Sequence, residues 1–119
     1  MKTDRIILCR IGEEPEADIR LLITRVPKKL KGWVHVPELA PSPYLFRKAM
    51  QWKKEGLWLQ KWPEYESQFF KEMNQPTANR YIERLVQRIK EGKTVALSCF
   101  CVDEKHCHRS LVKQVVLQK

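Results

Sequence analysis

Four short stretches of the chain carry the runs of apolar and β-branched residues that are typical of buried strands. The clearest are 5–11 and 94–98, and the segment 33–36 is shorter. Segment 18–26 fits either a strand or a short helix, which Pro27 would end. These four segments are the candidate strands.

Apolar residues at helical spacing mark the regions between and after these strands. Ser42 is a suitable N-cap with Pro43 as the first helical residue, because proline has no N–H to lose there. A further helix is expected to begin at Pro63, and the next is expected to be capped by Thr77. A last helical pattern contains Leu111 and the valines that follow it.

Strands at both ends of the chain with helices between them predict the α/β class with a largely parallel sheet. The 119 residues, 43% of them hydrophobic, suffice for one core. We therefore expect a small single domain over residues 1–119, with helices flanking the sheet in a Rossmann-like three-layer arrangement.

Length and apolar content also bear on where the protein resides. No apolar run reaches the roughly 18 residues of a membrane span, and the N-terminal apolar stretch is too short for a signal peptide. We therefore predict a cytoplasmic protein with no membrane contact. Its four cysteines are then expected to be thiols, metal ligands or redox groups rather than structural disulfides.

The chain has a formal net charge of +9, and the excess lies after residue 20. Such a surface favours phosphate-bearing ligands or nucleic acid as partners, although it also serves solubility alone. Four tryptophans are interleaved with lysines, and Trp52 and Trp58 are the two expected to be exposed. No zinc-finger spacing, basic zipper or clear helix-turn-helix accompanies them.

The segment 99–110 contains three of the four cysteines and two of the three histidines. It lies between a predicted strand and a predicted helix, and ligands of open α/β sheets bind where loops leave the carboxyl ends of strands. Loop 37–42 has the same position after another predicted strand. If the strands are parallel, loops 37–42 and 99–109 open on one edge of the sheet and form a cleft. Two helix N-termini would point at this cleft and favour anions.

An anion site is the first interpretation of this cleft. Arg109 would lie in the first turn of the last helix, where its guanidinium offers a planar, bidentate fork for phosphate. The alternative is that Arg109 pairs with Glu38 or Asp103 and orders the loop. The predicted ligand-binding residues are Arg109, Ser42, Ser110 and Arg25.

A nucleophilic cysteine is the second interpretation. A thiolate at Cys107 would be activated by the helix N-terminus, Arg109 and a protonated histidine, with Cys101 as a resolving partner. The alternative is a buried thiol that only packs. Glu38 follows the strand at 33–36 and can act as acid or base, or it can form an ion pair. The candidate catalytic residues are Cys107, His108 and Glu38.

A metal site is the third interpretation. Cys99, Cys101, Cys107 and His108 (or His106) supply the ligand types that zinc prefers. The Cys-x-Cys spacing is unusual for zinc, and the side chains of adjacent residues 107 and 108 are expected to diverge. Cys9 would join only if the first strand lies next to the last. We therefore predict no cofactor, with zinc at these residues as the alternative.

Several motifs resemble the family catalogued as domain of unknown function 488. They are Pro37-Glu-Leu-Ala-Pro-Ser42, the aromatic segment Trp62…Tyr65…Phe69, the strand at 94–99, Cys107-His-Arg109, and Asp18-Ile-Arg-Leu-Leu-Ile-Thr-Arg25. The resemblance spans about residues 5–117 and is closer to members with Cys-His-Arg than to those with Asn-rich residues there. It implies a small intracellular α/β domain of prokaryotic or phage type, and no established reaction. The chain departs at Val26-Pro-Lys-Lys29, where many relatives carry Trp-Pro-Arg-Gly.

Taken together, these patterns predict a domain that binds a phosphate-bearing ligand, a nucleotide or a nucleic-acid end, between loops 37–42 and 99–109. Chemistry assisted by Cys107 or Glu38 is expected if the domain is an enzyme. The competing hypothesis is a non-catalytic basic module that binds nucleic acid or protein, with a Cys/His loop that is structural or binds metal.

Overall fold

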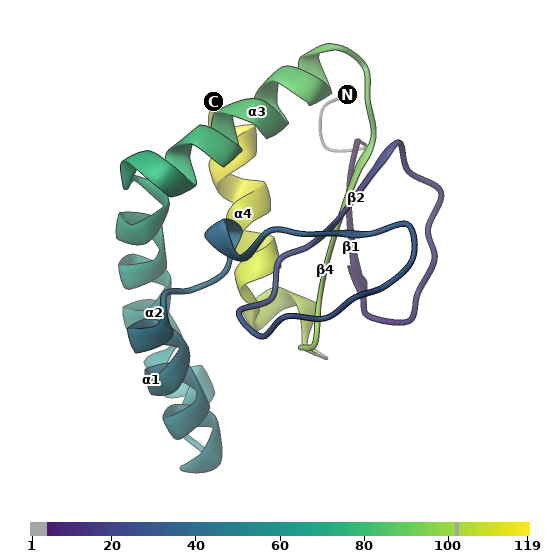
Figure 1. Cartoon of the computed structure of the whole chain (residues 1–119). Coiled ribbons are helices and arrows are strands. Elements are labelled where there is room, and N and C mark those ends of the chain that lie inside the picture. The colour runs from purple at the N-terminus through teal and green to yellow at the C-terminus, as the bar shows by residue number, and fades with distance from the viewer. Residues whose placement is uncertain (1–4, 102) are drawn as a thin grey trace.

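The computed structural model describes residues 5–101 and 103–119 of the chain (Figure 1). In chain order, its strands and α-helices are β1 (Ile6–Arg10), β2 (Ile19–Leu22), β3 (Val34–His35), α1 (Pro43–Lys54), α2 (Trp58–Met73), α3 (Pro76–Lys90), β4 (Val95–Cys99) and α4 (His108–Leu117). Two single-turn 3-10 helices, η2 (Pro37–Leu39) and η3 (Glu104–His106), lie in the loops before α1 and α4. Within this part of the chain, no helix has the length and apolar character needed to cross a bilayer.

The four strands form one parallel sheet in the order β1-β4-β2-β3. The last strand in sequence is therefore central, and Val95 lies opposite Ile6 on one side and Ile19 on the other. All five residues of β4 are buried. This arrangement confirms the predicted α/β class and the largely parallel sheet.

The α-helices gather on one side of the sheet, as Figure 1 shows. Alternation along β2 turns Arg20 to the opposite face, where its guanidinium lies 3.6 Å from the Glu14 carboxylate. Trp33 donates its indole N–H to the same carboxylate over 3.3 Å. Loops therefore cover the face on which a three-layer arrangement would place helices.

The core lies between the sheet and the helices. It contains Leu97 from β4, Phe69 from α2, Ile82 from α3 and Leu111 from α4, all with at most 1% of their surface exposed. α4 lies directly against the sheet and also contacts α2 and α3. The first turn of α4 is therefore held between the central strand and the helical layer.

Two of the three predicted helix starts need correction. α1 begins as predicted, with Ser42 Oγ accepting the N–H of Leu45 over 3.2 Å. α2 begins at Trp58, so Pro63 lies inside the helix, at an exposed position close to its N-terminal turn. α3 begins at Pro76, and Thr77 is inside its first turn instead of capping it. Proline is favourable at the first helical position, which Pro76 takes here.

Candidate functional site

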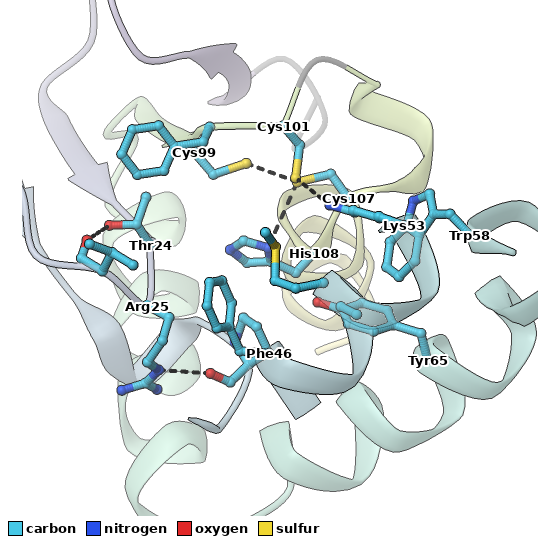
Figure 2. A pocket seen from close by; sticks show the side chains of 15 residues that line it. Thr24, Arg25, Phe46, Lys53, Trp58, Tyr65, Cys99, Cys101, Cys107 and His108 are labelled. Carbon is cyan, nitrogen blue, oxygen red and sulfur yellow. Dashed lines mark hydrogen bonds between the residues drawn. The ribbon is translucent and has the colours of Figure 1, made fainter. Parts of the chain in front are cut away.

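A pocket of about 410 Å³ opens at the carboxyl end of β4 (Figure 2). Pro41 of loop 37–42 and Cys99–Cys101, Cys107 and His108 of the segment 99–109 line it. Loops 37–42 and 99–109, which were predicted to form a cleft, thus both contribute residues to one cavity. We call this cavity the thiol pocket.

Three cysteine sulfurs meet at the inner end of the thiol pocket (Figure 2). The Sγ atoms of Cys99, Cys101 and Cys107 all lie within 4.8 Å of one another, and those of Cys99 and Cys107 are 2.8 Å apart. Cys99 ends β4 on its helical face, and Cys107 is the residue before the first turn of α4. Cys9 is excluded from the cluster although β1 is next to β4. It lies opposite Ser98, which faces away from Cys99.

The environment of the cluster favours one thiolate at Cys107. Hydrogen bonds from the thiols of Cys101 and Cys99 lower the pKa of Cys107, and the backbone N–H and charge of Arg109 lower it further. Hydrogen bonds with the thiols of Cys101 and Cys107, together with burial, raise the pKa of Cys99. A single negative charge is therefore expected in the cluster at neutral pH, on the sulfur nearest the start of α4.

Arg109 lies behind the cluster rather than in the pocket. Its side chain is fully buried, and its two terminal nitrogens donate to the carbonyl oxygens of Cys9 and Cys101, the latter over 2.7 Å. Its Nε has no hydrogen-bond partner among the described residues. No carboxylate lies within ion-pair distance of this guanidinium in that part of the chain, so neither pairing proposed from the sequence, with Glu38 or Asp103, is formed. Although burial opposes this, the charges of the neighbouring thiols raise the pKa of Arg109, so a thiolate at Cys107 is the anion expected to balance the buried charge.

His108 is placed as a proton acceptor for Cys107. Its Nε2 bonds to the backbone carbonyl of Ile23, which can only accept, so Nε2 carries the proton. Its Nδ1 therefore has a lone pair, and this atom is 3.7 Å from Cys107 Sγ. Burial lowers the pKa of His108, which keeps the ring neutral. The activation expected from a protonated histidine is replaced here by a neutral base.

The helices α1 and α2 supply residues that the sequence did not single out. Lys53 Nζ is 3.5 Å from Cys101 Sγ and 4.6 Å from the centre of the Trp58 ring. Tyr65 also lines the thiol pocket, and burial raises the pKa of its hydroxyl. Trp58 is half-buried and lines the pocket, whereas Trp52 is buried with 8% of its surface exposed, against the expectation that it is exposed. Only the packing of α1 on α2 and of α2 on α4 brings Lys53 and Tyr65 to the cluster.

Other predicted site residues lie elsewhere. Glu38 and Ser42 line a separate hollow of about 310 Å³, where the Glu72 carboxylate accepts from both the backbone N–H and the hydroxyl of Ser42. Arg25 lines both cavities and donates to the carbonyls of Pro41 and Pro37, each over 2.9 Å.

Ser110 is turned back toward its own loop. Its hydroxyl donates to the carbonyl of Cys107 over 2.8 Å, as a residue of the first helical turn. Of the predicted catalytic and ligand-binding residues, the thiol pocket thus contains Cys107, His108 and Arg25. Glu38, Ser42, Ser110 and Arg109 line other surfaces or are engaged by the protein itself.

The donor set of the pocket also fits a thiophilic metal ion. Tetrahedral zinc with Zn–S bonds of about 2.3 Å places its sulfurs roughly 3.8 Å apart, a separation compatible with the 4.8 Å cluster once Cys99 and Cys107 move apart. His108 Nδ1 is 3.7 Å from Cys107 Sγ, so these adjacent side chains do converge, but His108 is not among the residues whose ligand atoms all lie within 4.8 Å of one another. His106 is turned away to Asp103, 2.8 Å from its carboxylate.

The fold and site define a parallel α/β domain with a three-thiol pocket at the carboxyl end of its central strand. Over residues 6–119, the chain matches the family model DUF488-N3a, described as the active DUF488-N3 subclade. The protein therefore belongs to the domain of unknown function 488 family, as its motifs predicted. No curated protein and no solved structure matches the chain.

Proposed function

We propose that the protein is an enzyme that binds a small phosphate-bearing substrate of the nucleotide class in the thiol pocket and attacks it with Cys107. The observation behind this proposal is the surroundings of the Cys107 sulfur. A basic ring nitrogen of His108 lies 3.7 Å away, and the buried charge of Arg109 has no carboxylate partner among the described residues. The description of the matching subclade as active agrees with catalysis.

The lining of the thiol pocket supports this substrate class. Phe46, Trp58 and Phe100 provide apolar and aromatic walls that suit a planar base. Lys53 and Arg25 add positive charge to the same cavity, which suits phosphate. The four cysteines are free thiols, a state that suits the reducing cytoplasm.

The proposed chemistry is nucleophilic displacement. The Cys107 sulfur donates an electron pair to an electrophilic atom of the bound substrate, and the bond to the leaving group breaks with its electrons going to that group. When Cys107 starts as a thiol, its proton passes to His108 Nδ1. Lys53 stabilises negative charge that develops beside Cys101.

Alkylation by iodoacetamide, mapped by mass spectrometry across a pH series, tests the proposal. We expect Cys107 to react at about pH 6, where an ordinary thiol is almost fully protonated. Cys9 is the matched control, because it is also buried but its pKa is raised by that burial and it lies on the other face of the sheet. AMP and ADP are expected to protect Cys107, while glucose at the same concentration is not.

Two outcomes contradict the proposal. Labelling of Cys107 as slow as that of Cys9 at low pH excludes an activated thiolate. Rapid labelling that AMP, ADP and inorganic phosphate all leave unchanged excludes the substrate class, while it leaves the nucleophile in place.

A second candidate function follows from the convergence of three thiols, with the His108 imidazole beside one of them. In this alternative the four groups bind zinc and hold the loop 99–109 in place, and the domain is a non-catalytic binding module. Elemental analysis of protein purified without chelator separates the two. One zinc per chain, with thiols that react only after chelation, favours the module. Metal well below one per chain favours the nucleophile.

A further inference from the structure

A second cavity lies beside the edge strand β3, apart from the cysteines. It has a volume of about 360 Å³ and is lined by Lys28, Lys29, Leu30, Lys31, Trp33 and His35. All but His35 belong to the connector between β2 and β3, where many relatives are expected to carry a different element. We call this cavity the basic hollow.

The lysines of the basic hollow are not neutralised by carboxylates in the part of the chain that the structure describes. Lys28, Lys29 and Lys31 are exposed, and none of them forms an ion pair with a described residue. Cations elsewhere on the surface do pair with carboxylates, as Lys48 does with Glu64 over 3.4 Å. Three like charges within four residues repel one another, so a polyanion that neutralises them is strongly favoured.

An aromatic wall and a hydrogen-bond acceptor complete the hollow. The Trp33 ring is half-buried and is oriented by its bond to Glu14, whose carboxylate also faces Arg20. His35 Nε2 is 2.7 Å from the carbonyl of Thr24, which leaves Nδ1 as an acceptor. An indole beside several ammonium groups is the combination that binds single strands, since bases stack while lysines contact phosphates.

The basic hollow and the thiol pocket are built on one continuous piece of chain. Thr24, Arg25 and Val26 line the thiol pocket, and the lysines begin two residues later. The hydrogen bond between His35 and the Thr24 carbonyl joins the two linings directly. The two cavities are therefore neighbours along this segment of the chain.

We propose that the basic hollow binds the backbone of a single-stranded nucleic acid, whose terminal nucleotide enters the thiol pocket. Entry of the terminal nucleotide into the thiol pocket rests on the proposed function, whereas binding of the backbone in the basic hollow does not. The nucleotide that the thiol pocket binds is then the last one of a nucleic-acid strand, which free AMP and ADP mimic. An acidic protein has no bases to stack on the Trp33 ring, so nucleic acid is the partner that the hollow favours.

Fluorescence anisotropy with labelled oligothymidylate and oligouridylate across a salt series tests the proposal on the full chain. If three phosphates are contacted, Lys28→Gln/Lys29→Gln/Lys31→Gln should make the log–log salt slope shallower by about 2. The control Lys71→Gln/Lys90→Gln/Lys93→Gln removes the same charge from exposed lysines of α2, α3 and the turn before β4. It should leave the slope and affinity nearly unchanged. Trp33→Leu should weaken binding about tenfold or more with no change in slope.

Several results would overturn the inference. These are no binding by the unmodified chain, equal losses in the two triple variants, or a polyglutamate competitor that binds as tightly through the same lysines. Circular dichroism of every variant establishes that it is folded. Cys107 alkylation, measured in the same proteins, separates the two proposals. Normal alkylation with no oligonucleotide binding refutes the hollow alone, while lost alkylation with intact binding refutes the nucleophile alone.

Discussion

The two strand-to-helix junctions at the carboxyl edge of the sheet differ in how the N-termini of their helices are capped. The junction before α1 is closed by its own side chains: Ser42 caps the helix, Pro43 removes one N–H, and Glu72 binds Ser42. The junction before α4 begins at Cys107, which makes no side-chain cap hydrogen bond of the usual kind. Its buried groups are a thiol cluster and an arginine without a carboxylate partner among the described residues.

Under the proposed function, the junction before α1 contributes stability and the junction before α4 contributes the chemistry. A satisfied cap contributes to folding and leaves nothing for a ligand. A helix N-terminus with a thiolate and buried positive charge is held in place by the surrounding fold and has reactive groups available. Substitutions at Arg109, His108 and Ser42 separate these two roles, and their expected effects decrease in that order.

The largest effect is expected at Arg109. Arg109→Ala removes the donors to the carbonyls of Cys9 and Cys101 and leaves the Cys107 thiolate without its balancing charge. We expect the free energy of unfolding to fall by about 3–5 kcal/mol, measured by urea denaturation. Arg88→Ala removes an exposed arginine paired with Glu91 and is expected to cost at most about 1 kcal/mol. Equal losses in the two variants would show that Arg109 has no such structural role.

The second effect is an acid sensitivity that originates at His108. Burial lowers the pKa of His108 in the folded protein. Its stabilising contribution is therefore complete above the ordinary pKa of 6.5 and is lost as the pH falls from that value through the lowered pKa of the folded protein. In the presence of chelator, stability should decline below about pH 6.5 by at most about 1.4 kcal/mol per pH unit. His108→Gln keeps an N–H for the Ile23 carbonyl but does not titrate, and should flatten the profile. Parallel profiles for the two proteins would exclude this explanation.

The smallest effect is expected at the other junction. Ser42→Ala removes the cap of α1 and should lower the free energy of unfolding by about 1 kcal/mol. The rate of Cys107 alkylation should stay the same, because Ser42 lines a different hollow. Ser67→Ala, at an exposed position of α2, is the control for a serine without this role. A changed alkylation rate in Ser42→Ala would mean that the two junctions are coupled.

The elements that sequence reasoning predicted are those with local causes. Ser42 and Pro43 define a helix start by their own chemistry, and the strand at 94–98 is apolar on both faces because it is central. The cysteines converge because residues 99 and 101 share a face and Cys107 precedes the helix. The start of α2 was misplaced because proline is accepted near an N-terminal turn as well as at its first position.

The rest of the site depends on tertiary packing and has no local signal. Lys53 is one lysine among many along α1, and only the docking of that helix brings it to Cys101. The prediction that Arg109 binds ligand rests on its bidentate guanidinium in the first turn of a helix, yet the carbonyls of Cys9 and Cys101 accept its hydrogen bonds inside the protein. The separation of Ser42 from the cysteines depends on Glu72, thirty residues away.

The central position of β4 also has a consequence for how the protein is made. β1 and β2 do not pair with each other, and each is held by a strand that leaves the ribosome only after α1, α2 and α3. Pairings over such sequence distances are slow to form, because a long loop must close before they contribute. β1 therefore has no strand partner, and β2 has only β3, until β4 inserts between them. The same insertion delivers Cys99, so the three thiols come together only in chains that have completed their sheet.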